Sequence, residues 1–73
     1  MTVTVYSKPS CVQCTATTRA LNQRGVTYDL VYLTKDDAAM QNVLSLGYHQ
    51  APVVVAGEDH WSGFRPDKIG ALG

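Results

Sequence analysis

The pattern of hydrophobic and polar positions in the first half of the chain predicts two strands separated by a helix. Residues 2–6 alternate polar and apolar side chains and are rich in β-branched residues, which is typical of a strand. Between residues 11 and 24 apolar side chains recur at helical spacing, and Gly25 follows where a helix would end. Residues 26–33 are rich in aromatic and branched side chains and predict a second strand.

The second half predicts another helix, a hairpin and a final helix. Thr34 is expected to cap the second helix, with Asp36 and Asp37 in its first turn and Gly47 at its end. The continuous apolar run at 52–56 predicts a strand that is buried on both faces. The remaining expected elements are a turn at 57–59, a short returning strand at 60–62 and a helix at 66–72 that starts with Pro66.

These elements define an α/β fold with the order β-α-β-α-β-β-α. Two right-handed β-α-β connections would make neighbouring strands parallel, and the closing hairpin would add an antiparallel strand. We therefore expect a four-stranded mixed sheet with three flanking helices. No linker or repeat interrupts the pattern, so residues 1–73 are expected to form a single domain.

Composition and charge exclude several classes of function. A domain of 73 residues has a thin core, so we expect no large buried cofactor. Six basic and six acidic side chains cancel, which leaves no electrostatic attraction for nucleic acid or for an anionic membrane. The first residues lack the features of a signal peptide, so a cytoplasmic location is expected. A monomer is the expected state of a neutral chain of this size.

The chemistry is carried by the motif Cys11-Val12-Gln13-Cys14, which opens the first predicted helix. Unpaired amides and the helix dipole stabilise a thiolate at Cys11, and Lys8 adds a positive charge nearby. Cys14 lies one helical turn further on the same side, where it can attack a mixed disulfide formed by Cys11. The residues predict a two-electron dithiol carrier without a cofactor, in which Cys11 is the nucleophile and Cys14 is the resolving thiol.

Other interpretations of the cysteine pair stay open at this point. The two residues could be reduced core cysteines or a permanent structural disulfide, although a disulfide that closes a four-residue ring adds little stability. An intrachain zinc site would need His49 and His60 as further ligands, and these histidines form no paired motif. A metal or iron–sulfur cluster shared by two chains is a further alternative.

Three sequence blocks give the chain a resemblance to a known family. It resembles the thioredoxin superfamily and, within it, the NrdH-redoxins, the glutaredoxin-like electron donors of class Ib ribonucleotide reductase. The blocks are Lys8-Pro9-Ser10-Cys11-Val12-Gln13-Cys14, Gln50-Ala51-Pro52-Val53-Val54-Val55 and His60-Trp61-Ser62-Gly63-Phe64-Arg65-Pro66-Asp67.

The resemblance implies a thioredoxin fold in which Pro52 follows a cis peptide bond and faces the dithiol. It also implies that the backbone of Ala51 pairs with an extended segment of a partner. Glutathione-dependent glutaredoxins resemble the chain too, but the segment from Ser62 to Pro66 lacks their glutathione-binding turn. The resemblance therefore implies thioredoxin reductase as the electron source and the large subunit of class Ib ribonucleotide reductase as the substrate.

The resemblance also suggests which residues bind the partner or substrate. Trp61 and Phe64 could pack in the core or face a partner, and Arg65 could fix its turn or pair with a partner's carboxylate. Ser7 and Ser10 are candidate caps of the first helix. The residues expected to contact a partner are Lys8, Val12, Gln13, Ala51, Pro52, Trp61, Ser62, Gly63, Phe64 and Arg65.

Overall fold

The computed structural model describes residues 2–72 and contains the seven elements in the expected order. The strands are β1 (Val3–Ser7), β2 (Asp29–Tyr32), β3 (Val53–Ala56) and β4 (Asp59–Ser62). The helices are α1 (Val12–Gln23), α2 (Asp37–Ser45) and α3 (Pro66–Gly70). The predicted α/β fold, a mixed sheet of four strands with three helices, is confirmed.

The strands form one sheet in the order β2-β1-β3-β4, so β1 and β3 are internal and β2 and β4 are edges. β1 is parallel to β2, whereas β3 is antiparallel to both β1 and β4. The expectation that the second β-α-β connection also gives parallel neighbours was therefore wrong. After α2 the chain does not add a strand beside β2. It reaches the free edge of β1 and runs against that strand, a choice that helix and strand periodicity alone do not encode.

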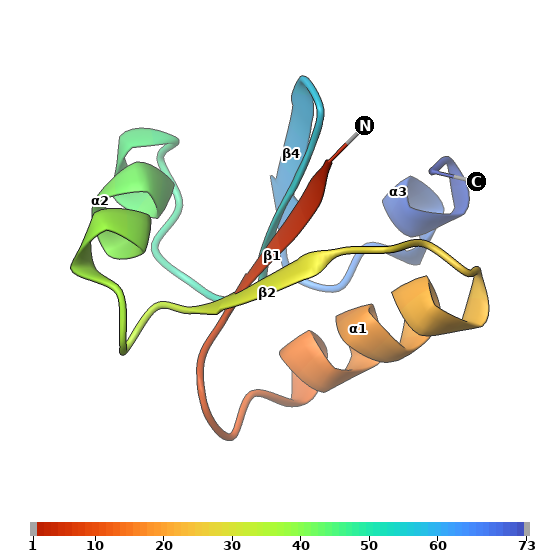
Figure 1. Cartoon of the computed structure of the whole chain (residues 1–73), viewed down its shortest axis with the longest axis horizontal. Helices are drawn as coiled ribbons and strands as arrows, with labels where there is room; N and C mark the ends of the chain where they lie inside the picture. The colour runs from red at the N-terminus through yellow and green to blue at the C-terminus, as the bar shows by residue number, and fades with distance from the viewer. Residues whose placement is uncertain (1, 73) are drawn as a thin grey trace.

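The helices cover the two faces of the sheet (Figure 1). α1 and α3 lie together on one face, and α2 lies on the other. Leu21 of α1 and Ile69 of α3 are almost fully buried in the core on the first face. Val43 of α2 packs in a second cluster with Val53, on the other face. Adjacent residues of β3 thus enter opposite cores, which confirms the prediction of a strand buried on both faces.

The helix starts differ from the sequence-based expectations. Asp36, not Thr34, caps α2, because its carboxylate accepts a hydrogen bond of 3.1 Å from the amide of Ala39. Thr34 lies in the preceding turn. α3 begins with Pro66 at its first position, as expected, because that position needs no amide hydrogen.

Candidate redox site

Cys11 and Cys14 form a disulfide at the N-terminal end of α1, with their Cα atoms 5.2 Å apart. Cys11 is itself the N-cap of the helix, and its Sγ accepts a hydrogen bond of 3.1 Å from the amide of Cys14. Neither Ser7 nor Ser10 caps α1, so that expectation was wrong. A hydrogen bond from a free helix amide stabilises negative charge on sulfur, so the site is built to hold Cys11 as a thiolate once it is reduced.

The two sulfurs differ in accessibility. Cys11 is half-buried and borders solvent, whereas Cys14 keeps only 4% of its surface exposed. A partner's disulfide can therefore approach Cys11 directly, whereas Cys14 is buried in the first turn of the helix. This asymmetry is what the predicted roles of nucleophile and resolving thiol require.

An open groove of about 480 Å³ runs beside the disulfide and is bordered by both cysteines, by Lys8 and by the first turns of α1. Its far wall is β2, from which Leu30 and Tyr32 point to the α1 side at alternate positions of the strand. Leu30 is 43% exposed and Tyr32 is 40% exposed, and neither belongs to the core on that face. Together with Val12, which is 83% exposed, they give the groove an apolar rim.

The sequence did not indicate Leu30 or Tyr32 as site residues. Their strand was expected only to form part of the sheet. Only the strand order shows that β2 is an edge strand with an uncovered face next to the cysteines. An alternating apolar pair on a strand carries no signal by itself, because most such pairs are buried.

The segment before β3 is hydrogen-bonded to the end of β4 and to the loop that follows it. The Ala51–Pro52 peptide bond is cis, as the resemblance implied. Pro52 is buried and Ala51 is half-buried. The carbonyl of Pro52 accepts a hydrogen bond of 2.8 Å from the amide of Gly63, and the Ser62 hydroxyl donates to the Gln50 carbonyl at 3.3 Å. Two of the three resemblance blocks are thereby joined.

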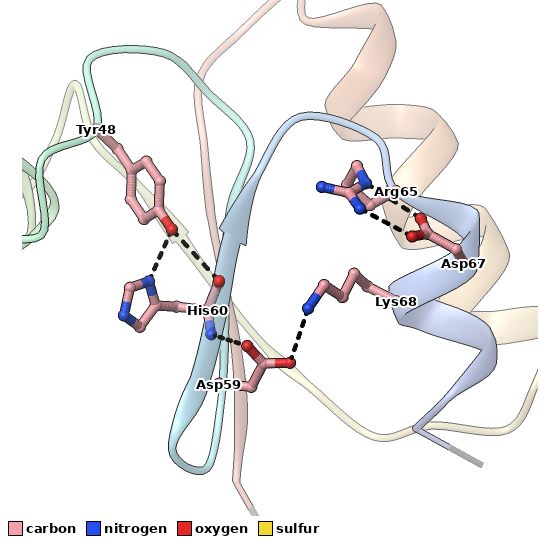
Figure 2. A network of polar contacts seen from close by, with 6 residues as sticks. All are labelled: Tyr48, Asp59, His60, Arg65, Asp67 and Lys68. Atoms are coloured by element: carbon pink, nitrogen blue, oxygen red, sulfur yellow. Dashed lines mark hydrogen bonds and ion pairs between the residues drawn. The ribbon is translucent and has the colours of Figure 1, made fainter.

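The third block divides between core and surface. Trp61 keeps only 3% of its surface exposed and belongs to the core cluster that contains Leu21 of α1 and Ile69 of α3, so its side chain takes the first of its two predicted roles, that of a core residue. Phe64 is 38% exposed on the loop that follows β4. The exposed Arg65 donates to the carboxylate of Asp67 at 2.8 and 3.1 Å (Figure 2), so in this structure it fixes the turn.

The Arg65–Asp67 contact has an electrostatic consequence for both groups. The hydrogen bond from the Arg65 guanidinium holds the pKa of the Asp67 carboxyl below its usual range. The same contact raises the pKa of Arg65. Both side chains are solvated, so solvent screens the attraction and the pair is a local clip rather than a major source of stability.

Of the two histidines that a zinc site would require, His60 contacts Tyr48 and His49 is exposed to solvent. The Tyr48 hydroxyl lies 2.7 Å from Nδ1 of His60 and 3.3 Å from its carbonyl oxygen, which connects β4 to the segment after α2 (Figure 2). His49 is exposed and lies in the loop between α2 and β3. Within residues 2–72, no group of three or more His, Cys, Asp or Glu side chains is arranged to hold a metal ion. In the same range, no helix has the length and apolar character needed to cross a bilayer.

The fold and site define a class: an α/β protein with a Cys-x-x-Cys disulfide at a helix start and a cis-proline immediately before β3. Residues 3–61 match the glutaredoxin family model. The chain is 42% identical over 72 residues to the glutaredoxin-like protein NrdH of Escherichia coli K12, covering 99% of this chain and 89% of that protein. It is 43% identical to NrdH of Salmonella typhimurium, with the same coverage.

A solved structure agrees with the sequence comparisons. The NrdH-redoxin of Escherichia coli superimposes with a TM-score of 0.97 at 41% identity, over 100% of this chain and 96% of that one. The chain therefore belongs to the glutaredoxin family and, within it, to the NrdH-like proteins. It is a glutaredoxin-like redox protein with a thioredoxin fold and a Cys11–Cys14 pair.

Proposed function

We propose that this protein carries electrons from thioredoxin reductase to a disulfide on the large subunit of a class Ib ribonucleotide reductase. The observation that carries the proposal is the asymmetric pair, in which Cys11 is accessible and amide-stabilised while Cys14 is buried one turn away. Membership of the NrdH-like proteins supports the choice of partners. The solved relative is described as having a thioredoxin-like activity profile, which supports thioredoxin reductase as the electron source.

The reaction is a double thiol–disulfide exchange. The Cys11 thiolate attacks one sulfur of the partner's disulfide, which forms a mixed disulfide and releases the partner's other sulfur as a thiolate. Cys14 loses its proton and attacks the Sγ of Cys11, which releases the second partner thiolate. Two electrons pass to the partner, its two sulfurs take up two protons, and Cys11 and Cys14 end in the disulfide state seen in the structure. No resident metal or organic cofactor takes part in the proposed exchange.

The apolar-rimmed groove is proposed to bind the chain segment that carries the substrate's reacting cysteine. A mixed disulfide at Cys11 puts that segment next to the groove, because Cys11 is part of its lining. The outer wall is the edge strand β2, and an extended segment can lie along such an edge with its apolar side chains against the strand. We assign the groove to an extended, partly apolar segment of the oxidised ribonucleotide reductase subunit.

The loop after β4 favours a protein reductase over glutathione. Its amide at Gly63 donates to the Pro52 carbonyl, and its amide at Phe64 donates to the side chain of Gln13. These two amides are used within the protein and are not free to bind a carboxylate of a small peptide. Pro66 has no amide hydrogen, and the anionic Asp67 follows it.

The experiment that tests the proposal measures NADPH oxidation with a model disulfide and two alternative electron sources. We expect fast turnover with thioredoxin reductase and little with glutathione plus glutathione reductase. Reduction of the oxidised ribonucleotide reductase subunit, followed by thiol titration, then tests the substrate. Turnover with glutathione alone would contradict the proposed electron source and identify a glutathione-dependent glutaredoxin.

A further inference from the structure

The loop between β4 and α3, residues 63–65, is tied to the dithiol motif by one side chain. Oε1 of Gln13 accepts a hydrogen bond of 3.3 Å from the amide of Phe64, across 51 positions of sequence. The neighbouring amide, that of Gly63, donates to the Pro52 carbonyl at 2.8 Å. The β4–α3 loop therefore has one attachment to the cis-proline segment and one to the residue that precedes Cys14.

Gln13 is anchored well enough to act as a support for this loop. The Thr17 hydroxyl, which is fully buried, donates to the Gln13 carbonyl at 2.8 Å and holds its backbone in the first turns of α1. A Cβ atom added to Gly63 would lie 3.3 Å from Oε1 of Gln13, so the loop backbone packs closely against the glutamine side chain. Gly63 also has a φ of +83°, which suits glycine and lets the loop make this approach.

The loop held in this way presents an aromatic ring. Phe64 is 38% exposed although it is large and apolar, and Gln13 itself is exposed. The hydrogen bond between them therefore lies at the surface, where packing does not enforce it. Without the acceptor oxygen, the Phe64 amide would hydrogen-bond to water, and the loop would keep its Gly63 bond to the cis-proline segment but lose its bond to the dithiol motif.

We propose that Gln13 is a positioning residue that fixes the β4–α3 loop and its Phe64 ring for binding of protein partners at the dithiol. The partner surface that fits is an apolar one close to the partner's reacting cysteines, such as that of thioredoxin reductase. The inference rests on the proposed function in one respect, namely that a protein and not a small thiol docks here. In this proposal Gln13 takes no direct part in the thiol–disulfide exchange and acts through the position of Phe64.

Two variants of equal reach separate the acceptor from the bulk of the side chain. Gln13→Met keeps the length and removes the acceptor, whereas Gln13→Glu keeps an acceptor oxygen at the same reach. For Gln13→Met we expect the hydrogen exchange of the Phe64 amide to accelerate about fivefold, and the KM for thioredoxin reductase to rise by a similar factor, the size of one neutral hydrogen bond. Gln13→Glu is expected to restore both values to within about twofold of the native protein.

The direct reaction of the reduced protein with a small aromatic disulfide, 5,5′-dithiobis(2-nitrobenzoate), measures the thiol chemistry itself. A rise in KM for the reductase that exceeds the change in this direct rate by about fivefold supports positioning. Equal changes in both rates would overturn the inference, because Gln13 would then act on the cysteines. A Gln13→Met variant with native KM and native Phe64 exchange would overturn it as well, and so would a Gln13→Glu variant that behaves like Gln13→Met.

A second substrate separates this inference from the proposed function. The same three proteins are compared in the reduction of insulin disulfides driven by dithiothreitol, which needs no reductase. If thioredoxin reductase failed to reduce the native protein, the proposed electron source would be wrong. The loss in Gln13→Met and its recovery in Gln13→Glu with insulin would still support the role of Gln13, and their absence would refute it.

Discussion

Two exposed leucines provide a matched test of the groove. Leu30 lies on β2 at the rim of the groove and is 43% exposed, whereas Leu44 lies on α2, outside the groove lining, and is 40% exposed. The variants Leu30→Gln and Leu44→Gln remove similar amounts of exposed apolar surface. If the substrate segment covers the groove, only the first variant should weaken binding.

The magnitude follows from the surface that Leu30 still exposes. Full burial of a leucine side chain contributes about 1.5–3 kcal/mol. A partner that covers the remaining 43% of Leu30 can gain roughly two fifths of that, or about 0.6–1.3 kcal/mol. This free energy corresponds to an increase of about three- to ninefold in KM for the Leu30→Gln variant.

The assay measures KM and kcat for reduction of the oxidised ribonucleotide reductase subunit, with thioredoxin reductase and NADPH as the electron supply. Both leucines are surface positions, so the free energy of unfolding of each variant should lie within about 0.5 kcal/mol of the native value, which urea titration checks. The direct rate with a small disulfide serves as a further control. If Leu30→Gln and Leu44→Gln had the same KM as the native protein, the assignment of the groove to the substrate would be refuted.

Three further predictions concern the sulfurs, the β4–α3 loop and acid stability. Cys11→Ser should abolish exchange, whereas Cys14→Ser should accumulate a stable mixed disulfide with its partner, visible on a non-reducing gel. Gly63→Ala should lower the free energy of unfolding in urea by about 1–2 kcal/mol, because its φ of +83° is costly for a residue with a Cβ. Since Arg65 holds the pKa of Asp67 low, the stability difference between native protein and Asp67→Asn should be present at neutral pH. It should disappear as the pH falls through the lowered pKa of the folded state, below the ordinary carboxyl range.

Each of these predictions has its own control. Capture of a partner by Cys11→Ser but not by Cys14→Ser would reverse the assigned roles. Gly47→Ala is the control for Gly63→Ala, since Gly47 has a φ of +90° and no atom near an added Cβ. Its free energy of unfolding should fall by a comparable amount, because the cost comes from the positive φ and not from the contact with Gln13. A stability difference for Asp67→Asn that grew toward low pH would have the wrong sign for a carboxyl whose pKa is lowered by folding.

The local elements were predictable because short-range chemistry specifies them. Alternation marked β1, the apolar run marked β3, and glycine after the periodic stretches marked the ends of α1 and α2. The prediction failed where neighbouring candidates compete for one role. Asp36 caps α2 in place of Thr34, and Cys11 caps α1 in place of a serine, because the cap is chosen by the exact point at which the backbone turns helical.

The redox site was partly accessible from sequence for a related reason. The dithiol spacing and the helix start are local, so the chemistry of Cys11 and Cys14 could be predicted from four residues and their context. The groove rim at Leu30 and Tyr32 could not be predicted in this way, since it exists only because β2 is an edge strand of the sheet. The internal bond from Gln13 to Phe64 joins residues too far apart in sequence for spacing to indicate.

Local sequence patterns were enough to predict the order of elements, the α/β class and a dithiol at the start of a helix, because hydrophobic periodicity and motif spacing act over a few residues. Three features became visible only in the folded chain: β3 runs antiparallel to β1, Trp61 is buried while Phe64 is exposed, and the groove beside the sulfurs is lined by residues of β2. Those features depend on how the sheet is ordered and on which faces the helices cover. They arise from contacts between segments that are distant in the sequence. No single stretch of the chain contains both partners of such a contact, so local patterns could not predict them.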